Sequence, residues 1–460
     1  MQKVLAIALL TWKAAFRFRL FLVVAVLLLG SVVGLPLLIE DDGTARGFTQ
    51  ILLTYTLTTI TALLGMSTLW LACGTLARDI EDCQIQMVAV KPIARWQIWF
   101  GKWLGLISLN AALLTLSGVC VFVLMHYRAG RLPEAQQQIL RNEVLVARGS
   151  AREPSSEGDI ASETDRLLRE RLERNPVSQV DLPEVRRQIL EQVKAEYQLV
   201  QPGYVRQWDI DLSSARRSLR GQPLFVRLKF NSAEKSPSGT FTVMMQAGAP
   251  PKPPWRSEPL SLAPDTFHEI EIPADLIGED GKLAIAVLNP NNTSLLFPLE
   301  DGLEVLYREG TFGLNFARGL GIIFCWMTLL ATIGLASASF LSFPVAAFFS
   351  LGLLAITLSS STIANAVSEG TLMGYNSETG RTGYSVMDHV AIPVFKVILG
   401  VVNLAKDFSP VDSLSTGRSI TWETVLRAAG QIIGILSGII GGVGIWIFQK
   451  RELATAQGTQ

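Results

Sequence analysis

The sequence predicts an α-helical polytopic membrane protein with six transmembrane helices and one extracytoplasmic domain, and three observations support this class. Both ends of the 460-residue chain carry apolar runs of the roughly 20 residues that a helix needs to cross a bilayer. The middle, from about residue 127 to 312, is polar and charged. Inside it, leucines at helical spacing give way to short alternating runs that are typical of β-strands. The extracytoplasmic part is therefore expected to be a helical segment followed by a jelly-roll-like β-sandwich.

The N-terminal membrane half, residues 1–126, begins with an amphipathic stretch. Residues 2–19 place four basic side chains among Leu, Ile, Trp and Phe, which favours a helix in the membrane interface over a merely basic cytoplasmic extension. These basic residues interrupt the apolar run too early for a signal peptide, so we expect no cleavage. Leu20–Ile39 is the first predicted span, Ile51–Ala77 is the second, and the third runs from about Leu104 to Met125. The second span is rich in threonine, notably Thr54, Thr56, Thr58, Thr59 and Thr61, which favours its burial within a helical bundle.

The polar middle divides into two parts. In residues 127–202, leucines recur at helical intervals among Arg, Glu and Gln, so solvated helices are predicted. Residues 203–312 contain the runs WDIDL, PLFVRLKF, TFTVMMQAG, FHEIEIP, GKLAIAVLN and SLLFPLEDGLEVLY, separated by Gly, Pro, Asn and Asp. These runs indicate an antiparallel β-sandwich, and its later part resembles the closing strands of jelly-roll modules of the carbohydrate-binding or galactose-binding type. Trp208 and Trp255 could contact a ligand by stacking on a sugar, or they could belong to the sandwich core.

The C-terminal membrane half, residues 313–451, contains three further predicted spans. Leu314–Val367 is too long for one span, and the small residues of Ala336–Ser342, followed by a proline, are predicted to divide it into two helices. The last span runs from about Val425 to Phe448, and residues 452–460 form a cytoplasmic tail.

A shorter apolar segment, Val390–Leu404, lies before the last span. It contains Pro393 and Lys396, and it is short for a crossing. We therefore predict an interfacial or re-entrant helix over residues 389–405 rather than a seventh span.

The basic residues predict the orientation in the membrane. With six spans both termini lie on one side, which collects Lys3, Lys13, Arg17, Arg19, Arg78, Lys91, Arg95, Lys102, Lys450 and Arg451. The short loop after the first span carries only Arg46. Because cytoplasmic loops are enriched in Lys and Arg, we expect both termini and the loop 78–103 in the cytoplasm, and the middle domain outside.

Several classes of activity lack support. The net charge is zero and no basic domain is present, so nucleic acid is not an expected partner. The three histidines, His126, His268 and His389, lie outside the interiors of the predicted spans, which gives no intramembrane catalytic or metal arrangement. No GxxxxGK[ST] motif occurs, so we expect no enzyme and no cofactor or metal in this chain. A helical bundle without its own energy source suggests a partner that supplies the energy.

The loop 78–103, RDIEDCQIQMVAVKPIARWQIWFGKW, carries the densest charge beside any membrane-length run. It opens with acids, continues through an apolar strip, and passes Lys-Pro into Arg and a closing Gly-Lys. The segment resembles the loop between the second and third spans of ABC-2 type ABC transporter permeases, where it forms the coupling helix and its exit. The arrangement of spans also resembles this family, most closely the nitrous-oxide-maturation and gliding-motility permeases.

The resemblance implies the permease subunit of an ATP-driven transporter, an exporter by the direction that the family implies. It would work as a homodimer or heterodimer with a second permease subunit in a bacterial inner membrane. ATP and magnesium would be bound by separate ABC-type ATPase subunits, and the loop would dock on them. The coupling residues are then Arg78, Asp79, Glu81, Asp82, Ile85, Met87, Val88, Lys91, Pro92, Arg95, Gly101 and Lys102.

Two alternatives remain open. The charges of the loop could serve only to fix the membrane topology. The whole protein could be a non-transporting, membrane-anchored platform that displays a glycan- or protein-binding β-sandwich.

Overall fold

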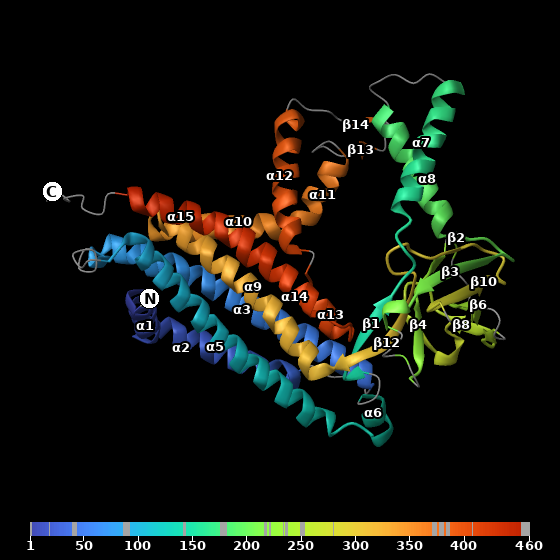
Figure 1. Ribbon diagram of the computed structural model, residues 1–460, viewed down its shortest axis with the longest axis horizontal. Helices are drawn as coiled ribbons and strands as arrows, with labels where there is room; N and C mark the ends of the chain where they lie inside the picture. The colour runs from blue at the N-terminus through green and yellow to red at the C-terminus, as the bar shows by residue number, and fades with distance from the viewer. Residues whose placement is uncertain are drawn as a thin grey trace. The chain divides into compact units, whose positions relative to one another are not determined.

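The computed structural model describes residues 2–17, 19–38, 44–85, 93–140, 144–174, 182–215, 219, 222–232, 234, 238–248, 254–278, 280–369, 375–376, 381–382, 387–406 and 408–451. The chain forms two compact units (Figure 1). A helical unit combines Met1–Leu145 with Thr311–Gln460, and a β unit comprises Val146–Gly310.

The helical unit is built from long helices that run side by side (Figure 1). Its first part contains α1 (Gln2–Arg17), α2 (Arg19–Leu38), α3 (Ala45–Glu81), α5 (Arg95–Ala129) and α6 (Glu134–Ile139). Its second part contains α9 (Phe312–Ala338), α10 (Phe343–Leu358), α11 (Ser360–Glu369), the short strands β13 (Tyr375–Asn376) and β14 (Arg381–Thr382), α12 (Asp388–Lys406), α13 (Pro410–Ser415) and α14 (Trp422–Ala428). A π-helical turn series (Ala429–Ser437) joins α14 to α15 (Gly438–Lys450) in one continuous helix.

Among the described residues, five helices are long and apolar enough to cross a membrane. They are Gly47–Glu81, Arg95–Ala129, Phe312–Ala338, Asp388–Ala405 and Trp422–Lys450. The bent pair α10 and α11 makes a sixth if it is one span, and α2 contains a shorter apolar helix, Leu22–Leu35. The chain therefore has the build of a polytopic helical membrane protein with a separate β-sheet domain.

The predicted division of the long apolar stretch is confirmed, since α9 ends at Ala338 and α10 begins at Phe343. Pro344 stands in the first turn of α10, where its missing N–H breaks no helical hydrogen bond. The structure differs after Leu358, where the helix axis bends by 58° into α11 instead of continuing.

The segment predicted to be too short for a span is longer than expected. Helix α12 continues through Pro393 over 19 residues, and its part Asp388–Ala405 is long and apolar enough to cross a membrane. Only 11% of that stretch is buried. It packs mainly against α11, so the two helices form a hairpin.

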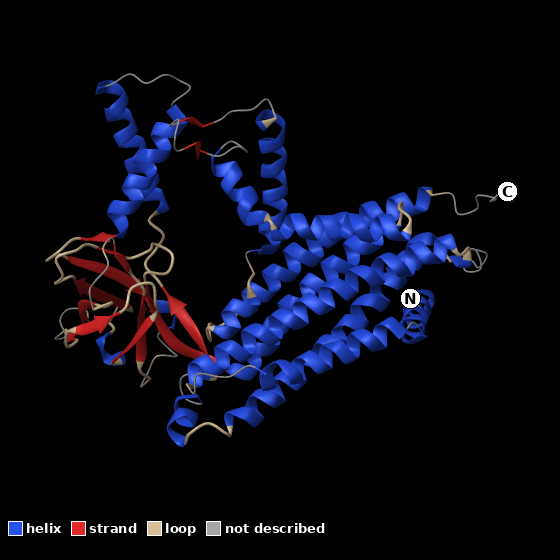
Figure 2. Ribbon diagram, turned by 180° about the vertical axis from the view of Figure 1, so that it is seen from behind, coloured by secondary structure: helices blue, strands red, loops and turns tan. Residues whose placement is uncertain are grey.

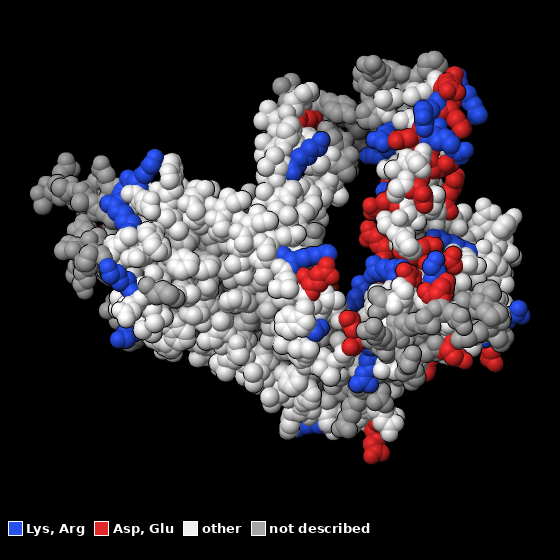
Figure 3. Space-filling model, viewed as in Figure 1, with Lys and Arg blue, Asp and Glu red and all other residues white. Residues whose placement is uncertain are grey.

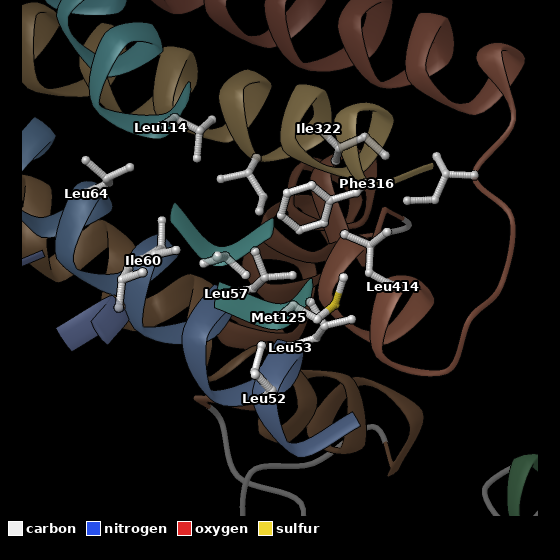
Figure 4. Packing of buried hydrophobic residues seen from close by; sticks show 14 of the residues in the cluster. Leu52, Leu53, Leu57, Ile60, Leu64, Leu114, Met125, Phe316, Ile322 and Leu414 are labelled. Carbon is white, nitrogen blue, oxygen red and sulfur yellow. The ribbon is translucent and has the colours of Figure 1, made fainter. Parts of the chain in front are cut away.

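Helix α3 lies at the centre of the helical unit and packs against α2, α5, α9 and α10. Its core stripe, Leu53, Leu57, Ile60 and Leu64, recurs every three or four residues and is fully buried. Figure 4 shows these side chains beside Phe316 of α9 and Met125 of α5.

Burial of this helix was expected from its threonines, but aliphatic side chains account for most of it. Of the five threonines at positions 54–61 only Thr56 is buried, and its hydroxyl donates to the Leu52 carbonyl oxygen at 2.6 Å. Further along the helix, Thr68 is fully buried and donates to Oδ1 of Asn110 in α5 at 3.0 Å.

The β unit contains a small sheet of order β2-β11-β5 and two larger sheets that share one core (Figure 2). One sheet has the strand order β1-β12-β4-β9, and the other has the order β3-β10-β6-β7 with β8 also paired to β6. Residues of both sheets, such as Val226, Val305, Ile285 and Val243, are fully buried in one shared core. The strands are β1 (Val146–Ala151), β2 (Leu199–Val200), β3 (Val205–Asp211), β4 (Leu224–Leu228), β5 (Asn231–Ser232), β6 (Phe241–Ala247), β7 (Trp255–Arg256), β8 (Leu260–Leu262), β9 (His268–Ile272), β10 (Lys282–Leu288), β11 (Leu295–Leu296) and β12 (Leu303–Thr311).

The predicted runs after residue 203 form β3, β4, β6, β9, β10, β11 and β12, whereas the short strands β5, β7 and β8 were not predicted. The domain boundary was placed too late. Strand β1 precedes the helical hairpin α7 (Glu157–Arg174) and α8 (Leu182–Gln198), and it belongs to the first sheet. The hairpin has a small core of its own around Ile160, Ile189 and Val193. The helical segment is thus an insertion within the β unit between β1 and β2.

Charges are distributed differently in the two units. Figure 3 shows Lys and Arg side chains at the end of the helical unit where α15 ends, and a long uncharged surface along its helices. The hairpin α7–α8 carries both signs densely, including the ion pair Arg186–Asp165 at 2.9 Å. The uncharged surface is what a hydrocarbon environment requires.

Candidate docking site at the α3–α5 loop

The end of α3 and the start of α5 lie at the end of the helical unit where α15 also ends (Figure 1). The structure describes the two flanks of the α3–α5 loop, up to Ile85 and from Ile93 onward. The predicted coupling residues Met87, Val88, Lys91 and Pro92 lie outside the described residues. The site is therefore built from the two flanks and from what they contact.

The first flank ends α3 in a sharp turn. The Asp82 N–H donates to the Arg78 carbonyl oxygen at 2.8 Å, and Cys83 adopts a left-handed conformation with φ of 58°. A left-handed residue after the last helical turn ends a helix, although glycine is the usual choice there. Asp82, Cys83 and Gln84 are exposed after this turn, whereas Ile85 is buried and anchors the flank in an apolar cluster.

Two charged residues of this flank contact the start of α10. The Phe343 N–H donates to Oε1 of Glu81 at 2.8 Å. The Arg78 guanidinium lies 4.3 Å from the centre of the Phe343 ring. A carboxylate at a helix N-terminus satisfies a free N–H and interacts favourably with the helix dipole. Glu81 and Arg78 therefore join the end of α3 to α10.

Asp79 is paired within the bundle. Its carboxylate accepts from Nζ of Lys102, which also donates to the Thr75 carbonyl oxygen at 2.6 Å. The Lys102 side chain is only 9% exposed, so its charge needs such partners. The pair ties the last turns of α3 to the start of α5.

The second flank begins α5 at Arg95, which contacts the end of the last helix. Nη1 of Arg95 donates to the carbonyl oxygens of Gln449 and Arg451, both at 2.7 Å. Nη1 of Arg451 in turn donates to the Ser339 carbonyl oxygen at 3.1 Å, at the end of α9. Both arginines thus satisfy carbonyl groups that a helix C-terminus leaves without an intrahelical partner.

Gly101 allows α1 to lie directly against α5. A Cβ atom at this position would lie 2.7 Å from Cβ of Ile7, and one at Gly105 would lie 2.7 Å from Cβ of Thr11. Glycines four residues apart permit such a close helix approach. The Trp12 indole N–H, which donates to Oγ of Ser108 at 2.8 Å, continues the contact. The amphipathic helix is therefore docked on α5.

The predicted coupling residues thus divide into two groups. Arg78, Asp79, Glu81, Arg95 and Lys102 are engaged in contacts within the chain. Among the described positions, Asp82 is the predicted charge most available at the surface, since it is exposed and its carboxylate contacts Gln84, two residues further along the chain.

Sequence reasoning missed the partners of these residues. Phe343 and Arg451 are separated from the loop by more than two hundred residues, and neither stands in a pattern that announces a contact. The tryptophans of α5 were a partial signal for packing between helices, because a buried indole N–H usually needs a hydrogen-bond partner. The Trp99 indole N–H donates to Oγ of Ser339 at 3.2 Å, and that of Trp103 donates to Oγ1 of Thr332 at 2.8 Å.

The two tryptophans proposed as ligand contacts lie in different surroundings. Trp208 is only 4% exposed and packs edge-on against Phe297, so it is a core residue and cannot stack on a sugar from solvent. Arg206 covers it at 4.5 Å; burial lowers the pKa of this guanidinium, and the nearby Glu153 carboxylate acts in the opposite direction. Trp255 is half-buried on β7.

Over the described ranges, no group of three or more His, Cys, Asp or Glu side chains is placed to hold a metal ion. A comparison of the chain with protein-family models, with curated proteins and with solved structures finds no match.

Proposed function

We propose that this chain is the membrane-spanning permease subunit of an ATP-driven ABC-2 type transporter, an exporter, coupled to a separate ATPase through the α3–α5 loop. The observation that carries the proposal is the position of this loop. It presents an exposed acidic turn at the end of the bundle where α3, α9 and α15 end and α5 and α10 begin. A partner that moves the loop would therefore act on five helices at once.

The proposed orientation places this end in the cytoplasm, together with both chain termini. Lys450, Arg451, Arg95 and Lys102 gather here, as the positive-inside rule requires. The opposite end also carries arginines, such as Arg128 at the end of α5. Arg128 precedes the β unit in the sequence, and basic residues in long translocated segments contribute little to the rule.

The six proposed crossings are α2, α3, α5, α9, α10 and the continuous helix of α14 and α15. In this arrangement the hairpin α11–α12 enters the membrane from the outer side without adding a crossing. The low burial of α12 supports a place in the lipid interface or against a second permease subunit.

The β unit would lie outside the cell membrane as a jelly-roll-like domain. Its two larger sheets alternate along the chain, so that β1, β4, β9 and β12 form one sheet and β3, β6 and β10 the other. This alternation supports a double Greek key. Because the unit has its own core, it also supports the second candidate function, a membrane-anchored platform that displays a binding domain without transport.

Co-purification tests the proposal. The affinity-tagged full-length chain, extracted from membranes of its native host, should retain a protein with a nucleotide-binding motif and ATPase activity. Asp82→Lys should reduce the retained ATPase about tenfold or more, because a reversed charge at an interface edge places like charges together. Glu81 is unsuitable for this test, since it also supports α10.

The matched control is Glu134→Lys, which reverses an exposed carboxylate at the start of α6. It should leave ATPase retention unchanged. Absence of any ATPase on the wild-type chain contradicts the permease proposal and favours the platform.

A further inference from the structure

The α3–α5 loop is bonded at both flanks to helices from the distant C-terminal part of the chain. At the first flank, Glu81 accepts the N–H of Phe343 at 2.8 Å. The Arg78 guanidinium covers the ring of the same phenylalanine. A carboxylate and a cation from the last turn of α3 therefore hold the first residue of α10 from two sides.

At the second flank, one guanidinium nitrogen holds the last turn of α15. Nη1 of Arg95 donates to the Gln449 and Arg451 carbonyl oxygens at 2.7 Å, and it lies 3.5 Å from that of Phe448. A cation at a helix C-terminus is favoured by the helix dipole, and its hydrogen bonds are charge-assisted. Phe448 itself is fully buried, so this end of α15 is fixed in the core as well.

A third contact closes the network on α9. Arg451, whose carbonyl accepts from Arg95, donates through Nη1 to the carbonyl oxygens of Ser339 at 3.1 Å and Ala338 at 3.4 Å. From α5, the Trp99 indole N–H reaches the Ser339 hydroxyl. The start of α5 and the ends of α15 and α9 are thus connected in a closed ring.

These contacts share one property that packing alone does not have. The contacts of Glu81, Arg95 and Arg451 are made with backbone groups at a helix terminus and not with one flexible side chain. Backbone groups at a helix end move with the whole helix, because the intrahelical hydrogen bonds make it a rigid rod. Through the covalent chain the loop is more than two hundred residues away from these termini.

We propose that Arg95, Arg451 and Glu81 form a helix-end clamp that makes the end of α3, the start of α5, the start of α10 and the ends of α9 and α15 move as one body. A displacement of the loop passes to α10 through Glu81, and to α15 and then α9 through Arg95 and Arg451. Discrete rigid-body movement of this kind is how packed helices transmit a change between sites. The clamp depends on the proposed function in one respect only, which is the ATPase partner that would move the loop.

Hydrogen exchange on the full-length chain in lipid nanodiscs, without any partner, tests the clamp. Arg95→Gln should speed exchange of the amides of residues 339–343 about tenfold, the size expected for a lost charge-assisted hydrogen bond. Arg95 binds the carbonyl oxygens of residues 448, 449 and 451 and reaches this segment through Arg451, so a purely local role predicts an effect confined to residues 448–451. Unchanged exchange at 339–343 overturns the proposal.

Two controls complete the design. Lys450→Gln removes the same charge from the same helix end, where this lysine stacks on Trp446 of its own helix, and it should leave residues 339–343 unchanged. The amides of Leu57–Leu64 in the core of α3 report general unfolding. If Arg95→Gln accelerates these as well, Arg95→Lys replaces it, because it keeps the charge and loses the guanidinium geometry.

A second arm separates the clamp from the proposed function. If both the wild type and Arg95→Gln retain an ATPase, added ATP should change exchange at residues 339–343 in the wild type and not in Arg95→Gln, with the change expressed per retained ATPase. If no ATPase is retained by the wild type, the permease proposal fails, and the partner-free exchange still decides whether the clamp exists.

Discussion

Replacing Glu304 with alanine is expected to destabilise the β unit by about 3–5 kcal/mol, the cost of removing one partner from a buried ion pair. The Glu304 side chain is completely buried. Its Oε2 accepts from Nε and Nη2 of Arg152 at 3.1 Å and from Oγ of Ser150 at 2.7 Å. Its Oε1 lies 3.4 Å from Nη1 of Arg227, which is itself 7% exposed. The substitution leaves the charge of Arg227 buried without this carboxylate.

Native-state hydrogen exchange of β4 and β10 in the full-length chain measures this loss. Glu304→Gln keeps the shape and an acceptor oxygen, so its effect should be clearly smaller than that of Glu304→Ala. Glu258→Ala removes an exposed carboxylate of the same unit and should be almost neutral. An effect of Glu304→Ala no larger than that of Glu258→Ala would show that the buried network contributes little.

Contacts made only after folding also explain why the sequence did not predict β1. The run VARGSA contains a charge and a glycine, which usually indicate a turn. It forms a strand because Arg148 pairs with Glu269 of β9 at 2.8 Å, and because Gly149 gives room to the Tyr307 ring of β12. Both partners lie more than one hundred residues away. A strand whose polar residues are satisfied only after folding carries no local pattern.

Elements whose residues follow a regular spacing were predictable. The helix α3 and the strand β10 both show periodic burial, at intervals of three to four residues and of two. The roles of single residues in the α3–α5 loop were not. Glu81 and Asp82 are adjacent acids in the sequence, yet one caps α10 and the other faces solvent. Their difference arises from the turn after α9, which places Phe343 beside only one of them.

Replacing Gly105 with valine is expected to separate α1 from α5. Even an alanine Cβ would lie 2.7 Å from Cβ of Thr11 and 3.0 Å from the Ala8 carbonyl oxygen, so the backbones must move apart. Overpacking of this kind costs about 1–3 kcal/mol, and the branched side chain adds to it. The Trp12–Ser108 hydrogen bond should be lost as the helices part. Detachment exposes α1 to protease, so trypsin cleavage after Lys13 measures the effect.

A second glycine, Gly352, provides a matched control whose substitution should raise stability instead of lowering it. A Cβ at Gly352 of α10 meets nothing within 4 Å, and alanine favours a helix over glycine by about 1 kcal/mol. Gly352→Ala should therefore leave the cleavage rate unchanged and slightly raise the thermal stability. Gly105→Ala should raise the cleavage rate despite the same gain in helix propensity. If both variants behave alike, the close approach of α1 to α5 does not determine where α1 lies, and the contact of the amphipathic helix with the membrane becomes the better explanation of its position.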